Sequence, residues 1–251
     1  MEDTKLFESR MRELSRRASE GGYYTASQFL TLAEQAGLRL LFEQGKIGTY
    51  TLSGGFPAAE RKYALFGDKE AFGYEPTEEA SWLAITPIAP KFADALSHRD
   101  FLGSIMALGI KRELLGDILT VDNIGYLYLA DSIAPYLCEN LTRVRHTDVR
   151  VTSVTSPPDV AVRLPDVTAI VAASERLDAL VAAVFKLSRE AAKTAIEKEL
   201  CAIDGKITVK TDTALSPPAT VSLRGYGRFL FEGSLGDTRK GKVRFAVRIF
   251  S

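Results

Sequence analysis

The most constraining feature of this 251-residue sequence is the stretch of residues 174–206. Apolar residues recur there at helical spacing, which predicts a buried stripe on a helix that ends near Leu187. Ser188 is suited to cap a second helix, in which Glu190 would lie favourably in the first turn. The pair Asp204-Gly205 follows, and it favours the positive φ angles of a tight hairpin turn. The stretch therefore predicts two packed helices and a β-hairpin.

Basic side chains in this stretch are spaced so that they converge on one surface. Arg189 and Lys193 are one i,i+4 step apart and should project from the same face of the second helix. Arg176 opens the first helix, and Lys186 closes it. Four cations can therefore converge on one surface.

The order of residues also follows a known pattern: R-L-D, a gap, S-R-x-x-A, and then I-x-x-G-x-V-x-V-N-G. The matching positions are Arg176-Leu177-Asp178, Ser188-Arg189, Ala192, Ile196 and Gly205. The stretch thus resembles the S-four RNA-binding module, which is found in a ribosomal small-subunit protein, tyrosyl-tRNA synthetases and pseudouridine synthases. Glu199 stands where that family usually has Gly, and Asp204 stands where it usually has Asn. The resemblance implies that Arg176, Lys186, Arg189 and Lys193 are candidate phosphate contacts, and both departures place an acid near them.

Asp178 has two interpretations, because R-L-D also occurs in the active motif of pseudouridine synthases. In those enzymes a small, glycine-containing turn follows the motif. Here the residues 179–181 continue a helix. We therefore interpret Asp178 as an acid that stabilises the fold.

The distribution of charge supports an RNA-facing C-terminal part. The chain has 32 basic and 32 acidic residues, and a net charge of zero argues against a generic nucleic-acid binder. Residues 174–251, however, carry 14 basic and 9 acidic side chains. Cationic charge is expected to gather where a protein contacts phosphate.

The C-terminal tail, residues 224–250, alternates apolar and basic residues with a period of two. Phe229 and Phe231 oppose Arg228, and the run from Val243 onward opposes Arg244 and Arg248 in the same way. This pattern predicts strands with one buried and one basic face. The further candidate RNA contacts are Arg224, Arg228, Arg239, Lys240 and Lys242.

The N-terminal part predicts two helices, a strand and a third helix. The first helix should end at Gly21-Gly22, and Thr31 with Glu34 has the spacing of a capping box for the second, which should stop near Gly45. A strand is expected over residues 48–53. Pro57 then suits the first position of a helix, whose N-terminus could take an anion, although a capped surface helix is the favoured interpretation.

The central part predicts the order βαββαβ, which is that of a ferredoxin-like sheet. The expected strands cover residues 82–87, 117–121, 125–129 and 148–155, and the helices cover 101–108 and 131–141. Asp122-Asn123 should form a hairpin turn. Tyr126 and Tyr128 project from one strand face, either as a platform for bases or as part of a core or partner surface.

Lys111 and Arg112 lie near the expected end of a helix in this central part. The helix dipole favours cations at such an end, which is the structural interpretation. Exposed on a loop, the two side chains are also well placed to contact phosphate.

The combination of GGFPAAERK, HRDFLGSIMALGIKRELLGDI, ENLTRV and the S-four pattern resembles the YlmH family of bacterial proteins. That resemblance implies an α+β protein with an N-terminal α/β domain (1–80), a central ferredoxin-like RNA-binding domain (81–160) and an S-four RNA-binding domain (174–251). It also implies association with ribosomal RNA and peptidyl-tRNA on the large ribosomal subunit, in ribosome-associated quality control. Family members are further linked to cell division.

Catalytic and metal motifs are not expected. The sequence has no Walker loop, H-E-x-x-H or G-x-S-x-G, and His98 and His146 lack metal-ligand spacing. We therefore expect a non-catalytic RNA binder without cofactor or metal, monomeric when free. The alternatives are an RNA-modifying enzyme with an unrecognised active site and a cell-division scaffold.

Two features of the sequence indicate its cellular setting. Cys138 and Cys201 form no C-x-x-C pair, and no cleavable leader is evident, which predicts a cytoplasmic protein. Apolar runs are interrupted too early to span a bilayer.

Overall fold

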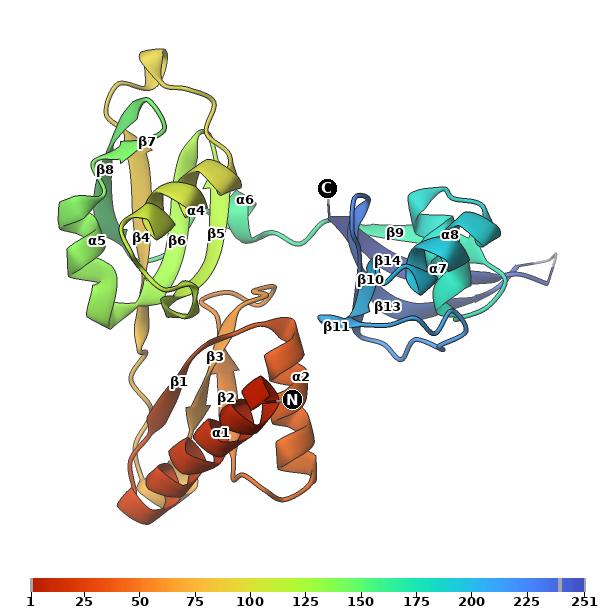
Figure 1. Cartoon of the computed structure of the whole chain (residues 1–251), viewed down its shortest axis with the longest axis horizontal. Helices are drawn as coiled ribbons and strands as arrows, with labels where there is room; N and C mark the ends of the chain where they lie inside the picture. The colour runs from red at the N-terminus through yellow and green to blue at the C-terminus, as the bar shows by residue number, and fades with distance from the viewer. Residues whose placement is uncertain (1, 239–240, 251) are drawn as a thin grey trace. The chain divides into compact units, whose positions relative to one another are not determined.

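Helices and antiparallel strands alternate along the chain, and together they confirm the α+β class (Figure 1). The structure is a computed structural model that describes residues 2–238 and 241–250. It divides into two compact units, Met1–Arg163 and Leu164–Ser251. The expected domains 1–80 and 81–160 therefore lie within one unit, although each has a sheet of its own.

The N-terminal part of the first unit is a three-stranded sheet with three helices. Its strands pair in the order β1-β3-β2, and both pairings are antiparallel. The helices are α1 (Glu2–Gly21), α2 (Leu32–Glu43) and α3 (Lys69–Phe72), and the strands are β1 (Thr25–Leu30), β2 (Tyr50–Ser53) and β3 (Lys62–Phe66). The capping box of α2 is confirmed, since the Glu34 amide donates to Thr31 Oγ1 at 3.3 Å and the Thr31 amide donates to Glu34 Oε2 at 2.7 Å.

Two predictions for this part were wrong. No helix follows Pro57: residues 54–61 form turns, and β3 begins at Lys62. The run KYALF is the central strand of the sheet, since it pairs with a strand on each side and has four buried residues. The run is too short for its hydrophobic periodicity to distinguish a strand from a helix, so it was not predicted. Strand β1 was not expected, and the antiparallel sheet is not the α/β arrangement that was predicted.

The central part of the first unit contains a five-stranded antiparallel sheet in the order β5-β6-β4-β8-β7. Its helices α4 and α5 follow β4 and β6, so the longer elements have the sequence βαββαβ. The strands are β4 (Ala80–Pro87), β5 (Leu115–Val121), β6 (Ile124–Ala130), β7 (Arg143–Val144) and β8 (Thr147–Val154). The helices are α4 (His98–Ala107), α5 (Ala134–Asn140) and α6 (Asp159–Val162), with 3-10 turns at Pro90–Phe92, Arg112–Leu114 and Asp131–Ile133. The hairpin at Asp122 (φ 49°) and Asn123 (φ 65°) is confirmed.

Aromatic residues join the two parts of the first unit. Phe29 and Tyr63 of the N-terminal sheet share a buried cluster with Trp82 and Tyr128 of the central sheet, and the Phe29 and Tyr128 ring centroids lie 5.8 Å apart. A Cβ on Gly55, whose φ is +80°, would meet Trp82 and Tyr128 at 2.9 Å. Tyr128 is 3% exposed, and Tyr126 packs against the same cluster. The two tyrosines therefore belong to the core and do not form an open platform.

A polar contact holds the same junction. The Asp117 carboxylate accepts hydrogen bonds from the backbone amides of Glu60 at 2.6 Å and Arg61 at 3.2 Å. Arg61 donates in turn to the carbonyls of Leu115 at 2.8 Å, Phe29 at 3.0 Å and Arg112 at 3.2 Å. Burial raises the pKa of Asp117 and lowers that of Arg61. The GGFPAAERK segment thus supplies the junction between two sheets.

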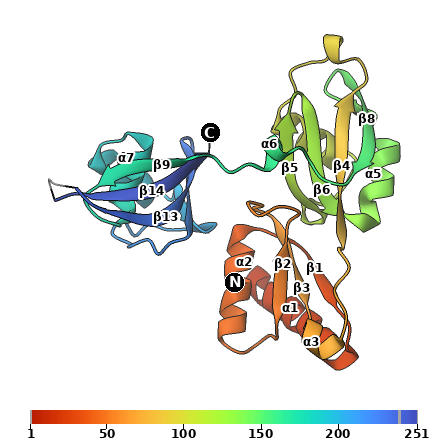
Figure 2. The same ribbon diagram turned by 180° about the vertical axis from the view of Figure 1, so that it is seen from behind.

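The second unit is a six-stranded sheet covered on one face by two helices (Figures 1 and 2). The strand order is β11-β10-β12-β13-β14-β9, and every pairing is antiparallel. The strands are β9 (Val167–Ala172), β10 (Cys201–Ile203), β11 (Lys206–Ile207), β12 (Ala219–Leu223), β13 (Gly227–Asp237) and β14 (Val243–Phe250). The helices are α7 (Leu177–Phe185) and α8 (Arg189–Glu197). Because β9 pairs with β14, this unit begins before the expected boundary at Ser174.

The predicted pattern of buried and outward residues in the second unit is confirmed. Leu177, Leu180 and Val181 are fully buried, and so are Phe229, Phe231, Phe245 and Val247 on the strands. The Asp204-Gly205 turn has φ angles of 47° and 76°, as a tight hairpin requires. The helices and the apolar strand faces therefore form one core.

We expect the replacement Asp117→Ala to weaken the first unit. It leaves two backbone amides at the junction without their acceptor, which should lower the free energy of unfolding by about 2 kcal/mol. The single tryptophan, Trp82, lies in the same aromatic cluster, so its fluorescence during urea unfolding reports this unit. Glu139→Ala, on an exposed helix end, is the matched control and should change the free energy by less than about 0.5 kcal/mol. Equal unfolding midpoints for the two variants would contradict the role of Asp117.

Candidate nucleic-acid interface

A buried carboxylate holds two of the predicted RNA contacts together. Asp178 is fully buried in the first turn of α7. Arg176 Nε donates to Asp178 Oδ1 at 3.2 Å, and its Nη2 donates to Oδ2 at 3.3 Å. Arg189 donates to the same two oxygens from Nε and Nη2, both at 3.2 Å. The Arg side chains stay 41% and 46% exposed, so the acid positions two guanidinium groups at the surface.

The protonation state of Asp178 follows from these bonds. Burial alone would raise the pKa of the carboxyl group. The hydrogen bonds from Arg176 and Arg189 outweigh burial and hold the pKa below its usual value. Asp178 is therefore a charged, structural acid, which agrees with its interpretation from the sequence.

The other two helical cations lie near this pair in the chain. Lys193 is one turn after Arg189 on α8, and its side chain is half-buried. Lys186 is exposed and ends α7 in the left-handed region, with a φ of 54°. Ser188 caps α8 as predicted, since its Oγ accepts from the Ala191 amide at 3.1 Å. The spacing predicted for Arg189 and Lys193 is confirmed.

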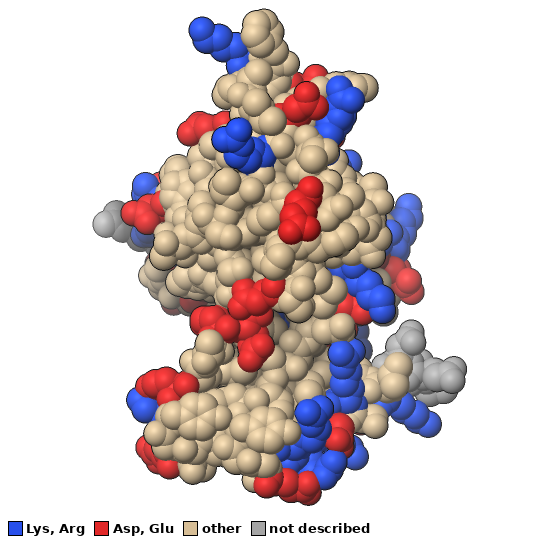
Figure 3. Space-filling view, turned by 90° about the vertical axis from the view of Figure 1, so that its left-hand side faces the viewer, with Lys and Arg blue, Asp and Glu red and all other residues tan. Residues whose placement is uncertain are grey.

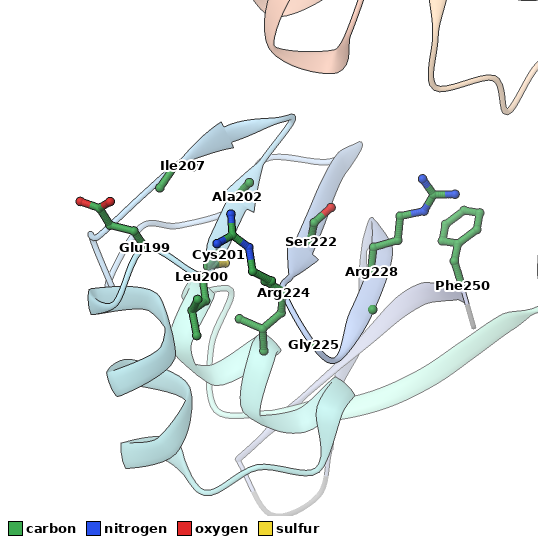
Figure 4. A pocket seen from close by; sticks show the side chains of 12 residues that line it. Glu199, Leu200, Cys201, Ala202, Ile207, Ser222, Arg224, Gly225, Arg228 and Phe250 are labelled. Atoms are coloured by element: carbon green, nitrogen blue, oxygen red, sulfur yellow. The ribbon is translucent and has the colours of Figure 1, made fainter. Parts of the chain in front are cut away.

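Two further predicted contacts border a groove on the same unit. Arg224 is exposed on the loop between β12 and β13, and Arg228 lies on β13 (Figure 4). The Arg228 guanidinium lies 4.4 Å from the centre of the Phe250 ring, and burial lowers its pKa. Ala202 and Ser222 line the groove as well. The groove could not be predicted from the sequence of any one strand, because its lining residues come together only through the register between neighbouring strands.

Only some of the remaining cations of the C-terminal tail lie within the described residues. Lys242 is exposed just before β14, and its backbone amide donates to Thr238 Oγ1 at 3.0 Å. Arg239 and Lys240 lie outside the described residues. Arg248 has an acidic partner, since its Nε donates to Glu232 Oε1 at 2.7 Å. The basic face of these strands is therefore partly neutralised.

The pair Lys111 and Arg112 is divided by the fold. Lys111 is exposed. Arg112 Nη1 donates to the carbonyls of Leu115 at 2.9 Å and Gly116 at 3.0 Å, and burial lowers its pKa to about 10. The Arg112 guanidinium thus stabilises the backbone at the start of β5, and its role as a phosphate contact stays a prediction. Lys111 keeps the position of a surface cation.

The two acidic departures from the S-four pattern occupy special backbone positions. Glu199 has a φ of 59°, which is the left-handed region that Gly adopts without strain. Asp204 has a φ of 47°, and its Oδ1 accepts from the Thr220 amide at 2.9 Å. The Gly and Asn of the family pattern therefore coincide with positions that require positive φ.

Charge on the first unit is mixed. On the face shown in Figure 3, acidic and basic side chains of the described residues lie side by side around a mostly neutral surface. Within residues 2–238 and 241–250, no group of three or more His, Cys, Asp or Glu side chains is placed to hold a metal ion. In that same part of the chain, no helix is long and apolar enough to cross a membrane.

We expect Asp178→Asn to destabilise the second unit and to flatten its pH dependence. The charged hydrogen bonds lost should cost about 2 kcal/mol at neutral pH. Because the folded pKa of Asp178 is depressed, its contribution is present above the unfolded pKa of about 3.9 and is lost as the pH falls through the folded value. Hydrogen exchange of β13 peptides near pH 7 and pH 3 measures both effects. A variant whose protection equals that of the wild type at both pH values would contradict this assignment.

Glu199 allows a paired test of backbone strain. Glu199→Gly and Glu199→Ala remove the same carboxylate, but Ala keeps a Cβ at a φ of 59°. We expect the Gly variant to be more stable than the Ala variant by about 1 kcal/mol. Thermal unfolding followed by circular dichroism checks the order. An Ala variant that melts at or above the Gly variant would show that this position carries no strain.

Comparisons with known proteins agree with part of the sequence interpretation. Residues 78–157 match the family model described as "Putative RNA-binding domain in YlmH". The chain is 27% identical to "Ribosome-associated protein quality control protein P2" of Bacillus subtilis (strain 168) over 249 residues, which cover 96% of this chain and 93% of that protein. The solved structure "Cell division protein ylmH from Streptococcus pneumoniae" aligns with a TM-score of 0.49 and 20% identity, over 61% of this chain and 91% of that one. The family model and the Bacillus relative support the resemblance to the YlmH family.

Proposed function

We propose that this protein is a non-catalytic RNA-binding protein that acts in ribosome-associated quality control of stalled translation. The observation that carries the proposal is the pair Arg176 and Arg189, which one buried carboxylate holds at the surface beside Lys193. Arginine presents a rigid fork that suits phosphate. The RNA-binding family model over residues 78–157 and the name of the Bacillus relative support the same function.

We further propose ribosomal RNA and peptidyl-tRNA on the large ribosomal subunit as the partners. Under this proposal residues 164–251 act as an S-four module, and the βαββαβ part acts as a ferredoxin-like RNA-binding domain. The protein would be cytoplasmic and monomeric when free. Two modest contacts on one chain gain affinity through effective concentration, and Lys111 offers the second contact.

Under this proposal the central sheet does not bind RNA by stacking bases on exposed aromatic residues. Its aromatic residues Trp82 and Tyr128 are buried against the N-terminal part. RNA would therefore contact the first unit outside this aromatic cluster, for example at the exposed Lys111. This arrangement agrees with the even mixture of charges on that unit, which limits the affinity of any single face.

The salt dependence of RNA binding tests the helical contacts. Replacing Arg189 and Lys193 together with Ala should reduce the slope of log affinity against log salt by about one to two units, because each lost phosphate contact releases one counterion fewer. Lys193→Ala alone should reduce the slope by about one unit, and it leaves the bonds of Asp178 intact. The control pair Lys198→Ala and Lys210→Ala removes two exposed cations from the same unit. An unchanged slope in the Arg189 and Lys193 variant would place the RNA elsewhere.

Association with ribosomes tests the wider proposal. We expect the tagged full chain to sediment with large ribosomal subunits in a sucrose gradient and to crosslink to ribosomal RNA and tRNA. Nucleoside analysis of that RNA should show no modification that depends on the protein, as a non-catalytic binder requires. Sedimentation at the top of the gradient, or an altered nucleoside, would contradict the proposal.

A further inference from the structure

A groove crosses the sheet of the second unit beside the loop that joins β12 and β13. Its volume is about 540 Å³, and strands β10, β12, β13 and β14 all contribute to its walls (Figure 4). That volume lies within the range of sites for small ligands, which is roughly 300–1,000 Å³. The groove is thus large enough for one nucleotide.

The floor of the groove is one row of cross-strand neighbours. Ala202 pairs with Ser222, Ser222 pairs with Arg228, and Arg228 pairs with Phe250. The residues on either side of this row in sequence, such as Cys201 and Phe229, are buried in the core beneath α7 and α8. Because side chains alternate along a strand, the row lies on the opposite face from the helices. Figure 4 shows its members pointing away from them.

The chemistry of this row suits an unpaired base. Ala202 and Ser222 are small, so they leave room above the sheet, and the Ser222 hydroxyl can donate or accept a hydrogen bond. Arg228 lies over the Phe250 ring at 4.4 Å, which forms a flat layered wall. Unpaired bases commonly stack on aromatic rings and on guanidinium planes.

Two charged residues lie at the loop end of the groove. Arg224 is exposed on the β12–β13 loop, and Glu199 lies at the same end, because the Arg224 amide donates to the carbonyl of Leu200 at 2.9 Å. The Arg224 guanidinium attracts a phosphate to this loop, and the Glu199 carboxylate weakens that attraction. Single-stranded nucleic acids bind in such grooves, where cations follow the backbone and flat side chains receive the bases.

We propose that this groove binds one unpaired nucleotide of an RNA strand, with the base on the row from Ala202 to Arg228 and the phosphate at Arg224. The proposal deepens the RNA-binding function proposed above and rests on it. The groove is separate from the helical cations, because it lies on the opposite face of the sheet. The second unit then has one surface for the phosphates of folded RNA and another for an unpaired residue.

Binding of two RNA probes to the full chain tests the proposal. The first probe is a fluorescein-labelled oligouridylate of about ten nucleotides, and the second is a blunt RNA duplex of the same length. Ser222→Leu fills the groove without changing charge, and Arg224→Ala removes the exposed cation. We expect each to weaken oligouridylate binding by about tenfold, while duplex binding changes by about twofold or less. Arg224→Ala should also lower the salt slope by about one unit, whereas Ser222→Leu should leave it unchanged.

Arg244→Ala is the matched control, since it removes one exposed arginine from the same outward face, outside the groove. It should weaken oligouridylate binding by about twofold or less. Circular dichroism melting verifies that each variant is folded. If Ser222→Leu does not fold, Arg224→Ala alone tests the proposal. Crosslinks from a 4-thiouridine version of the oligouridylate should map to peptides of β12 and β13.

Different outcomes separate the groove from the general function. Wild-type affinity in the folded Ser222→Leu or Arg224→Ala variants, or an equal loss in Arg244→Ala, would overturn the groove proposal. Crosslinks confined to α8 would do the same. The proposed RNA-binding function would survive these results as long as the Arg189 and Lys193 variant lost affinity. If the wild-type chain bound neither probe nor ribosomes, the general function itself would fail.

Discussion

The buried carboxylate of Asp178 is the interaction on which the second unit depends. A fully buried charge is costly unless it is paired, and here two guanidinium groups supply four hydrogen bonds to it. One arginine precedes α7 and the other opens α8, so a single acid fixes how the two helices begin. The same bonds limit the motion of both cations. Under the proposed function, the stability of this unit and its recognition of phosphate are therefore coupled at one residue.

The first unit shows how a neighbouring sheet changes what a common order of elements can do. A βαββαβ sheet leaves one face without helices, and RNA-recognition folds use that face. In this chain Phe29 and Tyr63 cover part of it, and the Asp117 bonds to residues 60 and 61 close the edge. Tyr128 and Trp82 serve as core residues for that reason. We infer that the proposed RNA contacts lie at the edges of the unit.

The features that could be predicted from the sequence were those that depend on residues close together in the chain. The capping box at Thr31, the cap at Ser188 and the hairpins at Asp122-Asn123 and Asp204-Gly205 involve residues within a few positions of each other. The helical and strand periods also identified the buried stripes of the second unit. The segment after Pro57 was predicted wrongly, because its hydrogen bonds go to Asp117, more than fifty positions away. Strand β1 was missed because it is identified only through its pairing with β3.

The sequence by itself determined the α+β class, the two packed helices after Arg176, the structural role of Asp178 and the concentration of positive charge in the last third. Tertiary structure alone decided which cations reach the surface. The Arg112 guanidinium donates hydrogen bonds to the carbonyls of Leu115 and Gly116, whereas the side chain of Lys111 beside it is exposed. It also decided that Ala202, Ser222, Arg228 and Phe250 form one row. The physical reason is that register between distant strands is set by the packing of the whole sheet, which no local pattern of residues records.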